Sequence, residues 1–160
     1  MDENFKIENA KIGDIEMLRI VDSRIRHDYQ LEAFLERSIA NDSCYLIMAD
    51  REIAGYAVFD YTFYEQGFVW DLYVALDYRR KGYGLAMMKY FESICGTSKL
   101  FTSTNLSNLP MQALLAKLGY KLSGVIHDLD EGDPELVYAK ILREGGPRRF
   151  FKMNQSDFHE

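Results

Sequence analysis

The chain of 160 residues contains no apolar run near the roughly 20 residues that a membrane-spanning helix needs. It has only two cysteines, Cys44 and Cys95, which lie far apart without metal-ligand spacing, so we interpret both as reduced thiols of a cytoplasmic protein. The first residues, MDENFKIENA, lack the basic-then-apolar order of a signal peptide. Basic residues are not in excess, because the net charge is -6. We therefore expect no membrane, nucleic-acid or metal partner.

Apolar residues make up 48% of the chain, which is enough for a folded core rather than a disordered segment. The length suits one domain. We expect that domain to cover residues 1–142, as a monomer or a homodimer. The remaining residues, 143–160, begin with a Gly-Gly-Pro sequence, and we expect a tail that is either partly detached or docked through its aromatic residues.

The pattern of apolar residues predicts eleven elements in the order β-α-α-β-β-β-α-β-α-β-β. The strands are expected at residues 4–10, 44–50, 51–64, 66–76, 99–105, 120–129 and 135–142. Asp14, Asp28 and Asn108 are placed to cap three of the helices. The first helix is expected to bury Ile15, Leu18, Val21 and Ile25. Early strands pair as hairpins and later strands are joined through helices, so the fold class is α/β (α+β mixed), with a mixed sheet and helices on both faces.

The stretch RRKGYGL at residues 79–85 joins an apolar strand to an amphipathic helix. A helix N-terminus carries unpaired N–H groups and partial positive charge, and glycine allows an anion to approach the backbone closely. This junction therefore predicts a phosphate or pyrophosphate site. It lacks the third glycine of a dinucleotide fingerprint, and Leu85 stands where a P-loop needs Lys followed by Ser or Thr.

A different pattern fits: L-x-V at Leu72 and Val74, followed by R-x-x-G-x-G at Arg79, Gly82 and Gly84. It resembles the acetyl-CoA signature of the GCN5-related N-acetyltransferases (GNAT family). A second segment, STNLSNLPMQALLAKLGY, resembles the family's other half-motif, in which an asparagine starts a helix that ends in Leu-Gly-Tyr. The similarity covers roughly residues 5–142.

The resemblance implies a central splayed sheet and acetyl-CoA as co-substrate. The pantetheine arm would pair with the free backbone of the strand at 72–74, where a backbone N–H near Val74 could polarise the thioester carbonyl. The amides of residues 80–85 would hold the pyrophosphate. The implied cofactor-binding residues are Leu72, Tyr73, Val74, Arg79, Arg80, Lys81, Gly82, Tyr83, Gly84, Leu85 and Asn108.

Direct attack of an amine on the thioester needs a base, and Asp71, in the strand of the cleft, is the first candidate. Strict alternation would place Asp71 on the same face as Val69 and Tyr73, and a bulge would change this.

The sequence departs from the family where many members carry a tyrosine as general acid, because this position is Leu115. Ser103 stands where some members carry a glutamate. Tyr120 and Tyr138 are the alternative acids, of which we take Tyr120 as the candidate; otherwise the thiolate leaves with help from water or unassisted.

The acidic loop HDLDEGDPE, with Asp130 and Glu131, would attract a cationic acceptor such as a small primary amine. Asp28 and Tyr29 lie in the region that forms the other wall of the acceptor pocket in the family. Three alternatives remain open: acetylation of a protein N-terminus or lysine, a non-catalytic CoA sensor, and an interaction module built on the RRFFK tail.

Overall fold

The computed structural model describes residues 4–143. The predicted tail therefore lies outside the described residues except for Arg143, and so does the RRFFK segment. The strands are β1 (Phe5–Asn9), β2 (Cys44–Ala49), β3 (Glu52–Phe63), β4 (Gln66–Val74), β5 (Lys99–Asn105), β6 (Lys121–Ile126) and β7 (Glu135–Ile141). The helices are α1 (Ile15–Val21), α2 (Tyr29–Ala40), α3 (Tyr83–Ile94) and α4 (Leu109–Lys117), with 3-10 turns η1 (Ile12–Asp14), η2 (Ser23–Arg26) and η3 (Leu76–Tyr78). The predicted order of strands and α-helices is confirmed.

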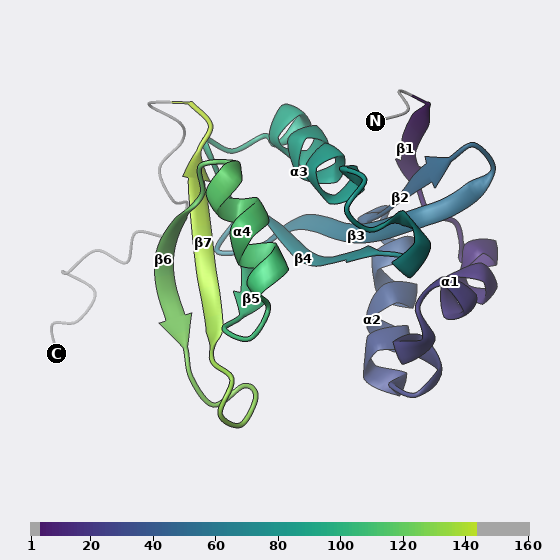
Figure 1. Ribbon diagram of the computed structural model, residues 1–160, viewed down its shortest axis with the longest axis horizontal. Helices are drawn as coiled ribbons and strands as arrows, with labels where there is room; N and C mark the ends of the chain where they lie inside the picture. Colours follow the sequence, from purple (N-terminus) through teal and green to yellow (C-terminus); the bar gives the residue numbers. More distant parts are fainter. Residues whose placement is uncertain (1–3, 144–160) are drawn as a thin grey trace, which may run out of the picture.

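The seven strands form one mixed sheet in the order β1-β2-β3-β4-β5-β7-β6. All neighbouring strands pair antiparallel except β4 and β5, which are parallel. In Figure 1 the β5-β7-β6 half stands steeply to the left, while β3 and β4 run across the centre. The sheet therefore has two differently oriented halves that meet at β4 and β5.

Each face of the sheet carries its own apolar core. One core joins α3 and α4 to the sheet through residues such as Met87, Phe91 and Leu115. The other packs α1, η2 and α2 against the opposite face through Leu18, Ile25 and others. Figure 1 shows α3 above the central strands and α1 and α2 below them. The expected mixed sheet with helices on both faces is confirmed.

The first predicted helix is shorter than expected. It ends at Val21, and Ile25 lies in the separate turn η2. The cause is Asp22, whose backbone is extended (φ -123°, ψ 99°) and whose side chain accepts a hydrogen bond from Arg24 N. Ile25 still reaches the core, because the 3-10 turn directs it to the same face.

None of the helices within residues 4–143 has both the length and the apolar character needed to cross a membrane.

Candidate active site

The two halves of the sheet separate after a short parallel contact. β4 and β5 pair only through Gly67–Val69 and Leu100–Thr102. At the last pair the buried Thr102 hydroxyl donates to the Val69 carbonyl oxygen at 2.8 Å. On its other side β4 shifts register against β3, because Val69 pairs with Phe59 but Asp71 pairs with Val58. Trp70 is therefore a bulge residue, and a bulge bends and twists its strand. The sheet opens into a fork at this point.

Val74 presents its backbone to the gap of the fork. Ala75 N donates to Ala54 O of β3 at 2.8 Å, and a trans peptide points its N–H and C=O in opposite directions, so the Val74 oxygen points away from β3. A Cβ added to Gly55 of β3 would lie 2.4 Å from the Tyr73 oxygen, so that oxygen faces β3 and the Val74 N–H faces the gap. The Arg79 Nε donates to the Val74 oxygen at 2.9 Å.

The N-terminus of α3 is uncapped. Asp28 and Asn108 accept hydrogen bonds from the first turns of α2 and α4, but Gly82 provides no such side chain for α3. The first bond of α3 runs from Ala86 N to Gly82 O, and within residues 4–143 the amides of residues 83–85 have no acceptor. Gly82 has a φ of 89°, which L side chains rarely adopt. The helix thus directs free N–H groups at the mouth of the fork.

The fork and the α3 N-terminus line one cleft of about 910 Å³. Of the predicted cofactor-binding residues, all but Lys81 line it. Asp71 lines it as well, together with residues that the sequence did not single out: Arg24, Trp70, Thr102, Met111 and Leu114. Asn108 lines the cleft, and its Oδ1 caps α4 by accepting from Met111 N (3.2 Å).

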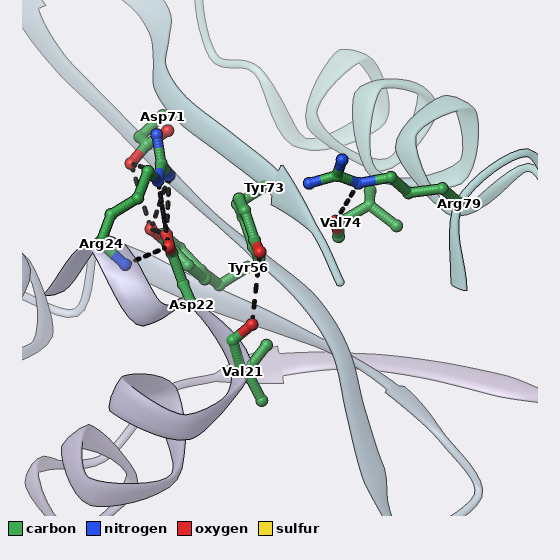
Figure 2. Close-up of polar contacts among 8 residues, drawn as sticks. All are labelled: Val21, Asp22, Arg24, Tyr56, Asp71, Tyr73, Val74 and Arg79. Atoms are coloured by element: carbon green, nitrogen blue, oxygen red, sulfur yellow. Dashed lines mark hydrogen bonds and ion pairs between the residues drawn. The ribbon is translucent and has the colours of Figure 1, made fainter. Parts of the chain in front are cut away.

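Asp71 belongs to a polar network on the α1–α2 side of β4 (Figure 2). The bulge places it on the face of Tyr73 and Tyr56, whereas Val69 belongs to the opposite core. The alternation that grouped Asp71 with Val69 is therefore broken. The Tyr56 hydroxyl lies 3.2 Å from Asp71 Oδ2 and 2.8 Å from Asp22 Oδ2. Tyr56 can donate to one carboxylate and accept from the other when that one is protonated.

Arg24 completes the network. Its Nε lies 3.0 Å from Asp22 Oδ1 and its Nη2 lies 2.7 Å from Asp22 Oδ2, while Asp71 Oδ2 is 3.9 Å from Nη2. The Arg24 guanidinium also lies over the Tyr73 ring, 4.9 Å from its centroid. Asp22 is 0% exposed, Asp71 has a 24% exposed side chain, and the Arg24 side chain is 54% exposed.

The two carboxylates have opposite pKa shifts. Burial raises the pKa of Asp71 above its ordinary value of 3.8, against the opposing effects of the Arg24 charge and the Tyr56 hydrogen bond. Burial acts in the same direction on Asp22, but hydrogen bonds from Arg24 and Tyr56 outweigh it and lower its pKa. Asp71 is thus the carboxylate that takes up a proton more readily, and it is the one that faces the cleft.

Several predicted site residues lie elsewhere. Tyr120 is buried in the α3–α4 core with its ring 5.7 Å from Lys140 Nζ, and it does not line the cleft. Leu115 is fully buried in the same core. Asp28 caps α2 through Gln30 N and Leu31 N, and neither it nor the 82% exposed Tyr29 lines the cleft.

The acidic loop braces the connection between β5 and α4. Asp130 Oδ2 accepts from Asn105 Nδ2 at 2.9 Å, and Asp133 accepts from the amide and hydroxyl of Ser107 at 2.9 and 2.6 Å. Neither Asp130 nor the exposed Glu131 lines the cleft. These contacts hold the segment that leads into Asn108. Within residues 4–143, no group of three or more His, Cys, Asp or Glu residues could hold a metal ion.

The chain belongs to the GNAT family of acetyltransferases, whose model matches residues 13–120. The expected family membership is confirmed. Among solved structures, a GNAT-family acetyltransferase from Bacillus cereus is 29% identical with a TM-score of 0.78, over 86% of this chain and 97% of that one.

Two further structures share the fold at lower identity. An N-acetyltransferase from Staphylococcus aureus is 17% identical, with a TM-score of 0.69 over 88% of this chain and 100% of that one. A protein from Salmonella typhimurium, solved with its cofactor acetyl-CoA, is 16% identical, with a TM-score of 0.67 over 88% and 95% of the two chains. No curated protein matches the sequence.

Proposed function

We propose that this protein transfers an acetyl group from acetyl-CoA to a primary amine by direct attack in a ternary complex. The observation that carries the proposal is that one cleft joins two backbone surfaces that no neighbouring strand or helix turn pairs with. The Val74 N–H and C=O face the gap of the fork, and the uncapped amides of residues 83–85 lie at its mouth. An extended amide-containing arm that ends in a pyrophosphate complements both surfaces.

The residues of the cleft fit coenzyme A. Arg79 and Arg80 add positive charge beside the α3 N-terminus, and the absence of a side chain at Gly84 leaves room for about one methyl group beside Leu114, Leu72 and Val74. Arg79 occupies the Val74 oxygen through a single Nε bond, which an incoming amide N–H can replace while the guanidinium turns to a phosphate. Asn108 and the apolar Met111 and Leu114 form the opposite wall.

Bound acetyl-CoA would supply a reactive acetyl thioester, from which the acetyl carbon bonds to the amine nitrogen as the carbon–sulfur bond breaks. The chain's part is to orient the amine and to take its proton. Asp71 is the proposed base, because it faces the cleft and its burial raises its pKa towards the range useful for proton transfer. Tyr56 can hold Asp71 in either protonation state, since its hydroxyl both donates and accepts. The Val74 N–H is placed to polarise the carbonyl.

Departure of the thiolate would proceed without a tyrosine at position 115. Leu115 cannot donate a proton, and Tyr120 lies in the core away from the cleft. A thiolate is a tolerable leaving group, and orientation alone can contribute effective molarities of about 10⁵–10⁸ M. The absence of this donor therefore affects the rate more than the type of reaction.

A small amine is our proposed acceptor, with a protein N-terminus or lysine as the alternative. The expected cationic acceptor loses part of its support, because Asp130 and Glu131 do not line the cleft; of the acidic loop only Glu135 lines it, and Arg24 adds a positive charge there. We keep the cytoplasm as the proposed location, on the ground that Cys44 and Cys95 are both free thiols.

The proposal is tested by following the release of free CoA thiol from acetyl-CoA in the presence of a panel of amines, with the Asp71→Asn variant alongside. We expect amine-dependent release that falls strongly in the variant while calorimetric binding of CoA is retained. Binding of CoA without turnover on any amine or peptide would favour the sensor. A chain that binds no CoA would refute the proposal entirely.

A further inference from the structure

We infer that the acceptor carries a carboxylate close to its amine, and that Arg24 binds this carboxylate while Asp71 receives the proton of the amine. The inference deepens the proposed function and rests on it. It concerns the class of acceptor, for which neither the family nor the motifs give an answer. The observations behind it are the fixed orientation of Arg24, its free nitrogen, its position relative to Tyr73 and its distance from Asp71.

Arg24 is held in place by a carboxylate that never reaches solvent. Asp22 is 0% exposed and contacts the Nε and Nη2 of Arg24 along one edge of the guanidinium. The Tyr56 hydroxyl lies 3.4 Å from the same Nη2. Within residues 4–143, Nη1 has no hydrogen-bond or ion-pair partner, although Arg24 lines the cleft. A buried anion thus orients one edge of the guanidinium and leaves the other available.

This arginine is separate from the phosphate-binding end of the cleft. Figure 2 shows Arg24 and Arg79 on opposite sides of Tyr73, with Arg79 over Val74 and Arg24 beside Asp22 and Asp71. The two guanidinium carbons lie 4.9 and 5.5 Å from the centroid of the Tyr73 ring. Arg79 follows directly on η3 and leads to α3, whereas Arg24 comes from η2 on the other face of the sheet. The pyrophosphate therefore accounts for Arg79 but not for Arg24.

The charges next to Tyr73 match a zwitterion. Arg24 is positive and Asp71 is negative when ionised, and their Nη2 and Oδ2 atoms are 3.9 Å apart. The charge of Asp22 pairs with the Nε and Nη2 edge of Arg24, so it is the Nη1 nitrogen that is left for a second carboxylate. A molecule with an amine and a carboxylate on the same or neighbouring carbons can contact both groups at once. A polyamine would satisfy Asp71 but offer no anion to Arg24 Nη1, and an amine without a carboxylate would likewise leave Nη1 unpaired. An amino acid, or a similar small aminocarboxylate, is the acceptor class that satisfies both.

A carboxylate bound by Arg24 would also fix the orientation of the acceptor. Guanidinium and carboxylate groups form paired hydrogen bonds that fix orientation as well as energy. With its carboxylate fixed on Arg24, the acceptor would direct its amine towards Asp71 and the fork. Arg24 is then a specificity residue that touches the acceptor, while Asp22 is a positioning residue that acts through Arg24.

The first test compares matched acceptors on the unaltered protein. CoA thiol release is measured with a set of L-amino acids and with the corresponding amino acid amides, which keep the amine but lack the carboxylate. We expect kcat/KM to be about 10- to 150-fold higher for the amino acids, as for the loss of a hydrogen bond to a charged group. Equal or better turnover of the amides, or of polyamines, would overturn the inference and leave the acetyltransferase proposal intact. No release with any acceptor would reject both.

The second test changes Arg24 conservatively. Arg24→Lys keeps the positive charge beside the buried Asp22 but removes the planar fork. We expect a higher KM for amino acids, an unchanged KM for their amides, and an unchanged affinity for CoA in a calorimetric titration. Arg26→Lys is the matched control, because Arg26 lies in the same turn η2 but is exposed and outside the cleft. An Arg24→Lys effect that is the same on amino acids and amides would contradict a contact with the carboxylate.

Discussion

Replacing Gly84 by alanine should weaken the binding of coenzyme A without lowering the stability of the fold. Gly84 is the second residue of α3 and lines the cleft. An added Cβ would lie 3.4 Å from Leu114 Cδ2, 3.6 Å from Leu72 Cδ2 and 3.8 Å from Val74 Cγ2, which are ordinary contact distances. The protein itself therefore tolerates the methyl group, and alanine improves helix propensity by up to about 1 kcal/mol. Any loss of function must come from the ligand side.

The expected loss can be estimated from the bonds at the α3 N-terminus. The methyl group would occupy the approach between α3 and β4, where a phosphate must come close to the backbone. Loss of one hydrogen bond to a charged group costs about 1.5–3 kcal/mol, and each 1.4 kcal/mol is tenfold in affinity. We expect Gly84→Ala to bind CoA about 10- to 150-fold more weakly in a calorimetric titration.

The same variant should unfold, without ligand, at a temperature equal to or above that of the parent protein. Gly124→Ala in β6 is the matched control, because an added Cβ there has no atom within 4 Å, and it should change neither property. Unchanged CoA affinity of Gly84→Ala would refute the placement of the pyrophosphate. A decrease in the free energy of unfolding as large as the decrease in binding free energy would show that Gly84 is needed for the fold.

Further predictions concern the polar network around Asp71, the fork between β4 and β5, and the buried thiol of Cys44. Asp71→Asn should lower kcat by about 10²–10⁴; in the parent, the acidic limb of kcat/KM should lie above pH 3.8, because burial raises the pKa of Asp71. Since the folded chain holds this proton more tightly than the unfolded chain, Asp71 contributes stability at acid pH that is lost as the pH rises through the raised pKa. Asp71→Asn should therefore raise the melting temperature at pH 7, and an unchanged or lower value would contradict the shift. Thr102→Val removes the hydroxyl bond to Val69 O and should lower the free energy of unfolding by about 1 kcal/mol in a denaturant titration. An unchanged free energy of unfolding would show that this bond does not stabilise the fork. Burial raises the pKa of Cys44 to about 12, so a thiol reagent at pH 8 should react with Cys44 only after denaturation; fast labelling of the folded protein would contradict its burial.

Local signals in the sequence predicted the parts of the site that depend on local backbone chemistry. Asp28 and Asn108 cap the helices that they were expected to cap, whereas the Asp14 side chain accepts from Lys11 N and does not cap α1. The uncapped start of α3 follows from a glycine where a capping side chain would stand. These features need only a few consecutive residues, so the sequence displays them directly. The phosphate-binding end of the cleft could be proposed on this basis.

The end of the cleft that we propose for the acceptor depends on backbone irregularities that no local sequence pattern predicts. The bulge at Trp70 turns Asp71 to the face opposite Val69, and alternation along the strand cannot detect an extra residue. Arg24 reaches the cleft because Asp22 ends α1 and starts a 3-10 turn, and an aspartate two residues before an arginine occurs in many other local structures. Conversely, Tyr120, Asp130 and Glu131 had suitable chemistry, but the packing places them away from the cleft, and only Glu135 of the acidic loop lines it.

Because β4 and β5 separate after a short pairing, backbone hydrogen-bonding groups are left without a strand partner in the middle of the sheet and not only at its edges. Exposed rims invite pairing with strands of other chains, and proteins commonly guard against this. Here α3 and α4 pack on the same face of the sheet and flank the opening, so that a polypeptide strand meets obstruction where it directs side chains to that face. A slender molecule without side chains does not. The two helices therefore lower the risk of self-association that an unpaired strand usually brings, while the strand stays available for pairing.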